Sequence, residues 1–222
     1  MSIAGPKIAA LAAGAINKRP RQGRSLASFE RMIAATKKLM LERGSENFTL
    51  QDVSDAGNVS IGSIYLRFES KDRLLHAVIA EELSDILEGE QSMVARVLEE
   101  SDGLADFLAK YIARYRDFLH ANAAMLRTIM QRAAIDPAVS EPGRETARLS
   151  RTMSINAIMT FEDQIRGPDK LEKAEAVFQI IFATIARQYG LGSNPESGDP
   201  ALWPMMRGHL GRMTFAYLQH SG

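Results

Sequence analysis

The fold is decided by residues 49–75, which read TLQDVSDAGNVSIGSIYLRFESKDRLL. Thr49 is well suited to cap a helix, and Asp52 stands at the third helical position, where its carboxylate can bond back to the cap. A helix that begins at this cap can run only to about Ala56, because a glycine and an asparagine follow it. The stretch therefore opens with a short, well-capped helix.

Gly57 and Asn58 are the residue types that most readily adopt a left-handed backbone, so they predict a sharp turn. Ser60 then caps a second short helix over residues 61–67. Ser70 caps a longer third helix, whose apolar residues keep helical spacing: Leu74, Leu75, Val78, Ile79 and Leu83. Two short capped helices joined by a tight turn predict a helix-turn-helix, whose second helix enters the major groove of DNA.

A basic helix precedes this motif. It is expected to begin near Ser25 or Ser28, either of which can cap it, and to stop at Gly44. Its apolar face consists of Leu26, Phe29, Ile33, Thr36 and Met40. Residues 1–24 are rich in alanine and glycine and end in a basic run, so they are expected to form a flexible basic arm.

Charge is unevenly distributed although the formal net charge is zero. Residues 1–80 carry 12 lysines and arginines against seven acidic residues, whereas residues 81–222 carry 15 against 20. This asymmetry indicates an N-terminal third that faces a polyanion, joined to an acidic body. A basic face that is merely solvated accounts for the charge equally well.

From Asp102 onward the pattern is helical throughout, and no segment alternates with the two-residue period of a strand. Breaks are expected at Asp136 and Pro137, at Gly167 and Pro168, and from Gly190 to Pro200. The expected fold class is all-α.

Residues 59–75 resemble the signature of the tetracycline repressor (TetR) family. The matching positions are Val59, Ser60, Gly62, Ile64, Tyr65, Phe68, Ser70, Lys71, Asp72 and Leu74. The resemblance covers about residues 25–85 and departs at Asn58, where the family usually has a glycine. Asparagine is the next best left-handed residue, so the turn is expected to survive.

The resemblance implies a helix-turn-helix domain over residues 25–70 and a helical ligand-binding and dimerisation domain over 71–222, which opens with a connecting helix at 71–85. It also implies a transcriptional regulator, in most cases a repressor that a small-molecule ligand releases from a palindromic operator. The expected partners are double-stranded DNA, a second copy of the chain and an unidentified effector. A non-catalytic small-molecule-binding or interaction protein with a vestigial helix-turn-helix is the alternative.

By position, the resemblance implies phosphate contacts from Thr49, Tyr65 and Lys71, and base or backbone contacts from Gln51, Ser60, Ile61, Ser63 and Arg67. Lys71 stands at a helix N-terminus, where backbone N–H groups already favour a phosphate. Arg67 or Gln51 can bond a guanine or an adenine through two hydrogen bonds. Core packing is the alternative for Tyr65, and it is the favoured interpretation for Phe68.

Two apolar seams repeat at alternating spacings of three and four residues. One is Leu171, Ala174, Phe178, Ile181 and Ile185; the other is Trp203, Met206, Leu210, Met213 and Tyr217. They predict a four-helix bundle between two subunits, with close backbone approach at Gly208 and Gly211. The alternative is that both seams form the core of a single subunit.

Between the motif and these seams, residues 102–166 are rich in aromatic residues and methionine, and in the family this region encloses a small-molecule pocket. The expected pocket residues are Phe107, Tyr111, Tyr115, Met125, Met159 and Phe161. Core packing is the alternative for each of them.

Other classes of protein have little support. The chain has no cysteine, which excludes disulfides and thiolate metal sites, and a cytoplasmic location is expected. No run approaches the roughly 18 apolar residues that cross a bilayer, so no membrane partner is expected. Asp117 and His120 have metal-ligand spacing but no second pair accompanies them, and no phosphate loop or nucleophile elbow is present. Neither an enzyme, a metal nor a cofactor is expected.

Overall fold

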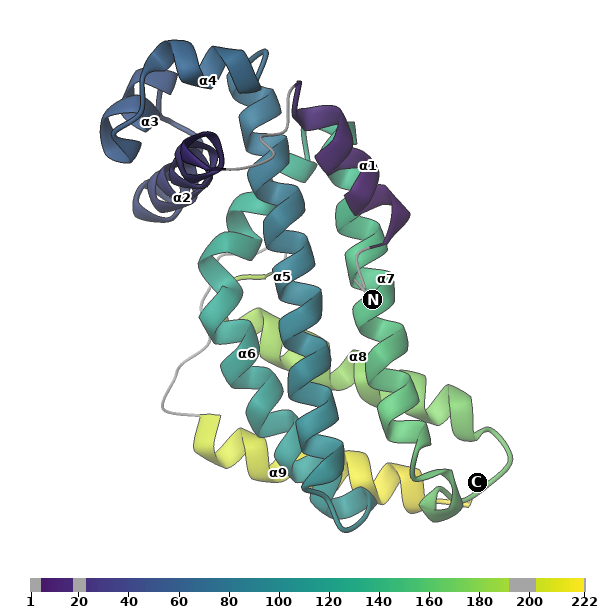
Figure 1. Cartoon of the computed structure of the whole chain (residues 1–222). Coiled ribbons are helices and arrows are strands. Elements are labelled where there is room, and N and C mark those ends of the chain that lie inside the picture. Colours follow the sequence, from purple (N-terminus) through teal and green to yellow (C-terminus); the bar gives the residue numbers. More distant parts are fainter. Residues whose placement is uncertain (1–4, 18–22, 192–202, 222) are drawn as a thin grey trace. The chain divides into compact units, whose positions relative to one another are not determined.

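The computed structural model describes residues 5–17, 23–191 and 203–221. These residues form helices and the turns between them, and the described ranges contain no strand (Figure 1). The expected all-α class is therefore confirmed. Among the helices described, none is both long and apolar enough to cross a membrane.

The first helices are α1 (Pro6–Ala15), α2 (Arg24–Arg43), α3 (Leu50–Gly57) and α4 (Ile61–Arg67). They are followed by α5 (Lys71–Glu99), α6 (Leu104–Ala133), α7 (Pro137–Met159), the 3₁₀ helix η1 (Glu162–Gln164), α8 (Lys170–Gln188) and α9 (Trp203–Gln219). The predicted breaks after α6 and before α8 are present. The break predicted from Gly190 to Pro200 lies mostly outside the described residues.

The chain divides into two compact units. The N-terminal unit comprises residues 1–86 and 124–146, and the C-terminal unit comprises residues 87–123 and 147–222. Helices α5, α6 and α7 each contribute residues to both units. The N-terminal unit therefore extends beyond residue 70, where the expected DNA-binding domain ends, because the first turns of α5 are buried with the helices before them.

Part of the expected flexible arm is a helix, which corrects the sequence-based interpretation of residues 6–15. Pro6 takes the first helical position, where its missing N–H removes no helical bond. The apolar side of α1 is buried at Ile8, Leu11 and Ala15. The alanine-rich composition therefore reflects a packed helix. Lys18, Arg19 and Arg21 of the expected basic arm lie outside the described residues.

A buried carboxylate from α7 caps the N-terminus of α1. Glu145 accepts the backbone N–H of Lys7 at 2.8 Å and that of Ile8 at 3.4 Å. Free N–H groups at a helix start need such partners, and the helix dipole favours a negative charge there. The cap comes from 138 residues away in sequence, so the local pattern gave no sign of it.

The start of α2 also differs from the prediction. Gly23 precedes the helix without a side-chain cap, and both Ser25 and Ser28 lie inside it. Its end is as predicted, since Gly44 adopts a left-handed backbone with φ 57°. The predicted apolar face is buried except at Leu26, which is 38% exposed.

In the C-terminal unit, aromatic residues of α6 stack along one face. Phe107, Tyr111 and Tyr115 have neighbouring ring centroids 5.5 and 5.1 Å apart, and all three are buried. Phe161 lies 5.3 Å from the Phe107 ring. Four of the expected pocket residues thus contact one another in a packed column. Half-buried Met159 also belongs to this unit, whereas Met125 is buried in the N-terminal unit.

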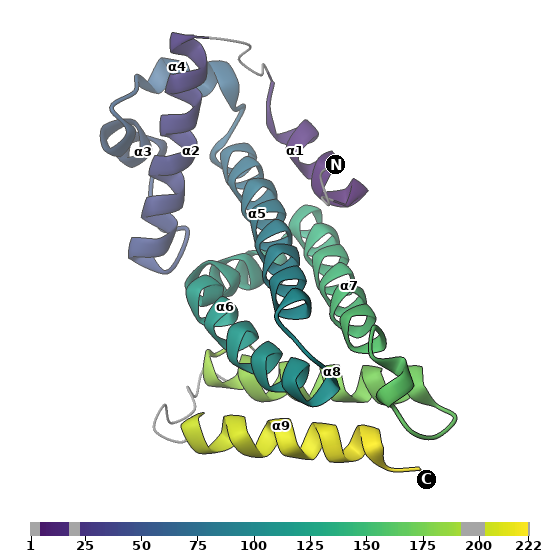
Figure 2. The same ribbon diagram turned by 60° about the horizontal axis from the view of Figure 1, so that its bottom comes forward.

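Helices α8 and α9 lie side by side (Figures 1 and 2), and this pairing corrects the predicted dimer seams. Five of the eight expected interface residues are less than 9% exposed in the single chain: Phe178, Ile181, Ile185, Trp203 and Leu210. A partner cannot cover side chains that their own subunit already buries, so these five form the subunit core. Met206 is half-buried, while Met213 is 66% and Tyr217 43% exposed.

Candidate nucleic-acid interface

The first helix of the motif, α3, has the predicted capping box. The Asp52 backbone N–H donates to Thr49 Oγ1 at 3.1 Å, and the Thr49 backbone N–H donates to Asp52 Oδ2 at 2.7 Å. The bond from the Thr49 backbone is the main reason that the pKa of Asp52 lies below its usual value. The helix extends to Gly57, one residue beyond the predicted end.

The two residues at the turn after α3 have different structural roles. Asn58 alone adopts the left-handed backbone, with φ 46° and ψ 54°. Gly57 is the last residue of the helix and allows close approach to α2, since a Cβ there would lie 3.1 Å from the carbonyl oxygen of Arg31 and 3.2 Å from Ala35 Cβ. The turn survives the departure from the family pattern, as expected, but only one of the two residues makes it.

The second helix, α4, matches its predicted bounds and cap. The Ser63 backbone N–H donates to Ser60 Oγ at 3.2 Å. Val53 of α3, Val59 of the turn and Ile64 of α4 are all buried. Buried Ser54 adds a bond from its Oγ to the carbonyl oxygen of Val59 at 2.5 Å. These contacts fix the angle between α3 and α4.

Tyr65 of α4 and Phe68, which follows the helix, have opposite environments. Phe68 is fully buried and stacks on Phe29 with ring centroids 5.7 Å apart, so core packing is the correct interpretation for it. Tyr65 is 57% exposed and therefore belongs to the surface of α4. The core alternative is excluded for Tyr65.

Several predicted DNA-contacting side chains already have partners in the free protein. The hydroxyls of Ser60 and Ser63 lie 2.7 Å apart, and Gln51 Nε2 donates to Asp55 Oδ1 at 2.8 Å. The Arg67 guanidinium donates to Ser25 Oγ on α2. These bonds orient the side chains within the protein and leave them further donors and acceptors for a base, because Gln51 keeps its Oε1 and a second N–H and Arg67 keeps further N–H groups.

Lys71 is also held within the protein. Its ammonium donates to the carbonyl oxygen of Glu46 and lies 4.6 Å from the centroid of the Phe48 ring. Lys71 stands at the N-terminus of α5 as predicted, and its ammonium connects that terminus to the loop between α2 and α3.

Sequence reasoning missed two exposed positions on α4. Leu66 is 58% exposed beside Tyr65, and Gly62 is exposed with no atom within 4 Å of a Cβ built on it. Helical spacing carries the signal, because buried Ile64 and Phe68 fix the inner side and place Leu66 on the outer one. A glycine on the outer side lets another backbone approach closely.

A charged cluster supports the base of the motif within the N-terminal unit. Arg132 bonds Glu46 at 2.8 Å, Asp72 at 2.9 Å and Asp136 at 2.7 Å, and His76 Nε2 lies 2.7 Å from the same Asp136 carboxylate. Partial burial opposes ionisation of Asp136, but the bonds from His76 and Arg132 outweigh it and hold the pKa at about 2. The loop before α3 is thereby tied to α5 and α6.

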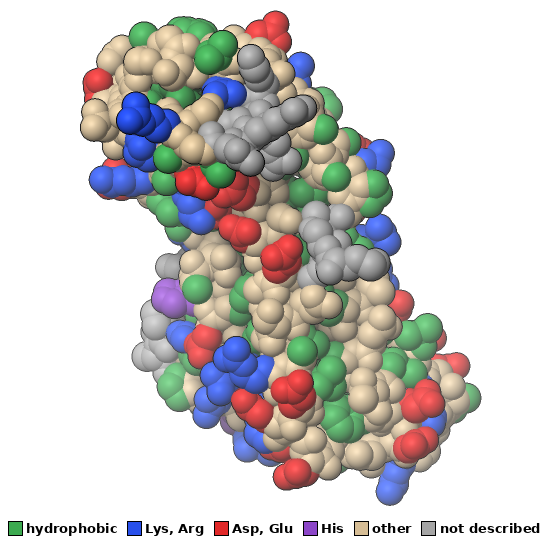
Figure 3. Space-filling model, viewed as in Figure 1, with side chains coloured by type: hydrophobic (Ala, Val, Ile, Leu, Met, Phe, Trp, Pro, Cys, Tyr) green, Lys and Arg blue, Asp and Glu red, His purple; other side chains and the backbone are tan. Residues whose placement is uncertain are grey.

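Basic side chains lie on the surface around α2 and α3, in the upper left part of Figure 3. Lys38 and Arg43 of α2 are exposed, and Arg43 lies 3.4 Å from Asp52. Both side chains belong to α2, and each lies within 4.0 Å of a carboxylate, since Lys38 is 3.7 Å from Glu42.

The helix-turn-helix geometry agrees with a comparison of the sequence with known families. Residues 32–78 match the model of the bacterial regulatory proteins of the tetR family. Over these residues the chain is similar to a tetR-type domain. The match includes most of α2, all of α3 and α4 and the start of α5, and a search of curated proteins finds no match.

Solved structures share the fold beyond this tetR-type domain. A putative TetR-family transcriptional regulator from Mesorhizobium loti has a TM-score of 0.65 at 16% identity, covering 89% of this chain and 96% of that one. Salmonella enterica GusR has a TM-score of 0.61 at 20% identity, with coverage of 90% and 100%. A transcriptional regulator from Rhodococcus has a TM-score of 0.57 at 21% identity, with coverage of 86% and 95%.

Proposed function

We propose that the protein is a sequence-specific transcriptional repressor that binds a palindromic operator as a homodimer and leaves it when a small molecule binds. The observation that carries the proposal is the exposed side of α4, where Tyr65 projects from a helix whose inner side is locked by Val53 and Ile64. A helix held at a fixed angle with an exposed outer side suits insertion into the major groove.

The DNA contacts follow from this placement. Tyr65 bonds a phosphate through its hydroxyl, and Thr49 and Lys71 contact the backbone at the starts of α3 and α5. Bases are read from Ser60, Ile61 and Ser63 of α4, and from Gln51 and Arg67 through donors and acceptors beyond those in their present bonds. Small polar readers give modest discrimination, so the shape of the DNA and the second subunit supply the rest.

A homodimer is supported by the apolar side chains that remain exposed on α8 and α9. They are Leu171, Ile180, Phe182, Met205, Met213 and Tyr217. Large apolar side chains at the surface of a subunit are candidates for an interface, and a second subunit doubles the number of base pairs contacted.

The test is fluorescence anisotropy with the DNA directly upstream of the gene for this protein, compared with a scrambled duplex of the same length and composition. We expect tighter binding to the upstream DNA, with an affinity that falls steeply as salt rises because phosphate contacts release counterions. Equal affinity for the two duplexes would contradict a sequence-specific regulator and would favour a protein whose helix-turn-helix is vestigial.

A further inference from the structure

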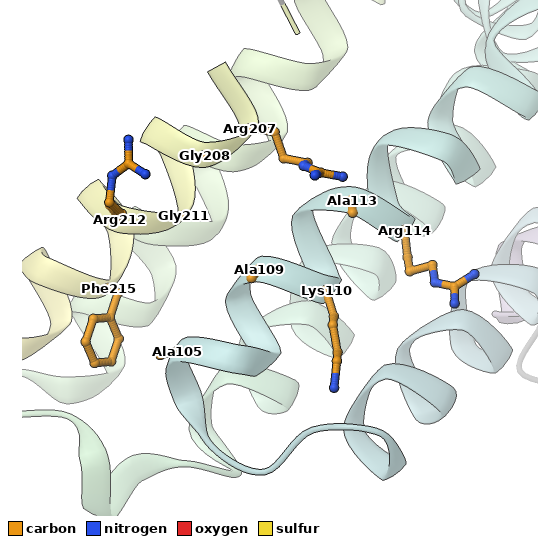
Figure 4. Close-up of a pocket in the computed structure, with 10 residues that line it drawn as sticks. All are labelled: Ala105, Ala109, Lys110, Ala113, Arg114, Arg207, Gly208, Gly211, Arg212 and Phe215. Atoms are coloured by element: carbon orange, nitrogen blue, oxygen red, sulfur yellow. The ribbon is translucent and has the colours of Figure 1, made fainter. Parts of the chain in front are cut away.

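An open cavity of about 490 Å³ lies between α6 and α9 in the C-terminal unit (Figure 4). Its floor consists of small residues. Ala105, Ala109 and Ala113 stand at successive turns of α6 and face the stretch of α9 that contains Gly208 and Gly211. The volume falls within the range of roughly 300–1,000 Å³ that is typical of small-molecule sites. The stacked residues expected to form a pocket do not line this cavity.

The two glycines of α9 are not explained by packing within the subunit. A Cβ on Gly208 would meet only Arg212 Nη1 at 3.6 Å, and one on Gly211 only Ile112 Cδ1 at 3.9 Å, both ordinary contacts. Glycine is less favourable than alanine inside a helix, so a helix with two unneeded glycines is less stable than it has to be. Because the two glycines have no side chain, the floor of the cavity stays open.

Four basic side chains lie around this floor, and none of the described residues that line it is acidic. The cations are Lys110 and Arg114 from α6 and Arg207 and Arg212 from α9. Lys110 pairs with Asp106 at 2.6 Å, and Arg114 lies 3.9 Å from Glu100.

The two arginines of α9 differ from these paired cations. In the part of the chain that the structure describes, neither Arg207 nor Arg212 has a carboxylate within 4.0 Å, and Arg212 contacts only the ring of His209, at 3.4 Å. Figure 4 shows the Arg207 side chain extending from α9 toward Ala113 of α6. Among the described residues, Arg207 therefore stands at the edge of the apolar floor with no carboxylate beside it.

We propose that this cavity binds a small amphipathic anion, a carboxylate with an apolar body. Arg207 bonds the carboxylate through its planar fork of N–H groups, and Arg212 adds positive charge. The apolar body lies on the alanines and glycines, which span about 12 Å along α6 from Ala105 to Ala113. The inference rests on the cavity alone and holds whether or not the protein binds an operator.

The test is a titration of the full-length protein with sodium decanoate, which joins a carboxylate to an apolar chain. The melting temperature is one readout, because a ligand of the folded state raises it. The second is the fluorescence of Trp203, which is the only tryptophan in the sequence and lies one turn before Arg207 on α9. We expect saturable changes in both, at least tenfold weaker binding of 1-decanol, and no response to acetate.

Three variants locate the binding. Arg207→Gln removes the cation from an exposed position and should weaken decanoate binding at least tenfold, with the far-UV circular dichroism unchanged. Gly211→Leu fills the floor and should abolish the binding. Arg148→Gln, an exposed arginine of α7 in the same unit, is the matched control and should bind decanoate like the wild type.

Wild-type affinity in Arg207→Gln would overturn the proposal by placing the anion elsewhere, even if Gly211→Leu fails to fold. Equal affinity for 1-decanol and decanoate would show that the carboxylate of the ligand does not contribute to binding, and it would overturn the proposal that the site binds an anion. No saturable response to millimolar decanoate would overturn the site itself.

Discussion

Gly57 and Asn58 show how two adjacent residues of one turn serve different physical needs. Gly57 has a helical backbone, and α2 would crowd a Cβ at this position. Asn58 has room for a side chain but adopts the left-handed conformation that most residues disfavour. The sequence marked both as turn residues because it contains no information on the distance to α2.

This division predicts that the two positions tolerate different substitutions. Gly57→Ala should reduce the free energy of unfolding by about 1–3 kcal/mol through overpacking against Arg31 and Ala35. Asn58→Ala should reduce it by about 1–2 kcal/mol through the left-handed backbone, whereas Asn58→Gly should change it far less. Urea unfolding followed by circular dichroism measures all three. A harmless Gly57→Ala would show that α2 and α3 are not in close contact.

Glu90 is a buried acid of α5 whose protonation should govern stability near neutral pH. It is 2% exposed, and the Ser150 hydroxyl donates to it at 2.7 Å. Burial raises the pKa of Glu90 from 4.5 to about 7, and the bond from Ser150 only partly offsets this effect. Folding therefore favours the protonated carboxyl.

Because the folded pKa of Glu90 lies above the unfolded one, its contribution is most favourable below about pH 4.5 and is lost as the pH rises through about 7. Glu90→Gln cannot ionise, so its stability relative to the wild type should rise across this window by on the order of 3 kcal/mol. Urea unfolding of both proteins at several pH values measures the difference. A difference that does not change with pH would mean that Glu90 stays ionised.

Local residue signals predicted the caps of α3 and α4 well and the partners of the exposed side chains poorly. Thr49, Asp52 and Ser60 act within three or four residues, so their bonds could be inferred from spacing. Arg67 bonds Ser25, which lies 42 residues away, and no local pattern records that contact. The burial of Phe68 was expected from the sequence, but its stacking partner, Phe29 of α2, was not.

At the scale of the element, α1 depends on a residue of a distant helix. Glu145 supplies the cap of α1, and at its other end the backbone N–H of Asn17 donates to the carbonyl oxygen of Arg67 at 2.9 Å. The helix is ten residues long, and isolated helices of this length are marginal in water. Its order should therefore depend on these contacts.

Glu145→Gln is predicted to destabilise α1 by about 1–2 kcal/mol, because a neutral amide is a weaker partner for the helix N-terminus. Hydrogen exchange should show faster exchange of the amides of residues 6–15, with the other helices unchanged. Glu141→Gln is the comparison variant, since Glu141 lies one turn earlier on α7, bonds exposed Arg144 and interacts with α1 through the charge of Lys7 without capping the helix. Equal protection of α1 in wild type and Glu145→Gln would mean that the carboxylate is not its cap.

The helical periods of α8 and α9 were read correctly from the sequence, but their partners were not. Spacings of three and four residues identify an apolar side, yet the same pattern suits a neighbouring helix of one chain or of another. Ile181 and Leu210 turned out to face the interior of their own subunit. The sequence pattern does not distinguish Ile181 and Leu210 from Met213 and Tyr217, which the structure shows to be exposed.

At the scale of the whole molecule, the account predicts a dimer held together by the exposed apolar residues of α8 and α9. Met213→Glu should convert the dimer to a monomer at micromolar concentration and weaken DNA binding, because a carboxylate at a buried interface has no partner there. Light scattering after size-exclusion chromatography gives the mass. Met130→Glu, at a methionine that is 46% exposed on α6, is the matched control. A dimeric Met213→Glu would place the interface elsewhere.

The central claim, that the outer side of α4 grips DNA, is tested most directly by the affinity of Tyr65→Ala for the upstream duplex. Tyr65 is exposed, so its removal should leave folding and the dimer intact while the affinity falls at least tenfold, corresponding to about 1.4 kcal/mol. Met130→Ala should bind like the wild type. Wild-type affinity in Tyr65→Ala, or loss of the dimer along with DNA binding, would contradict the account.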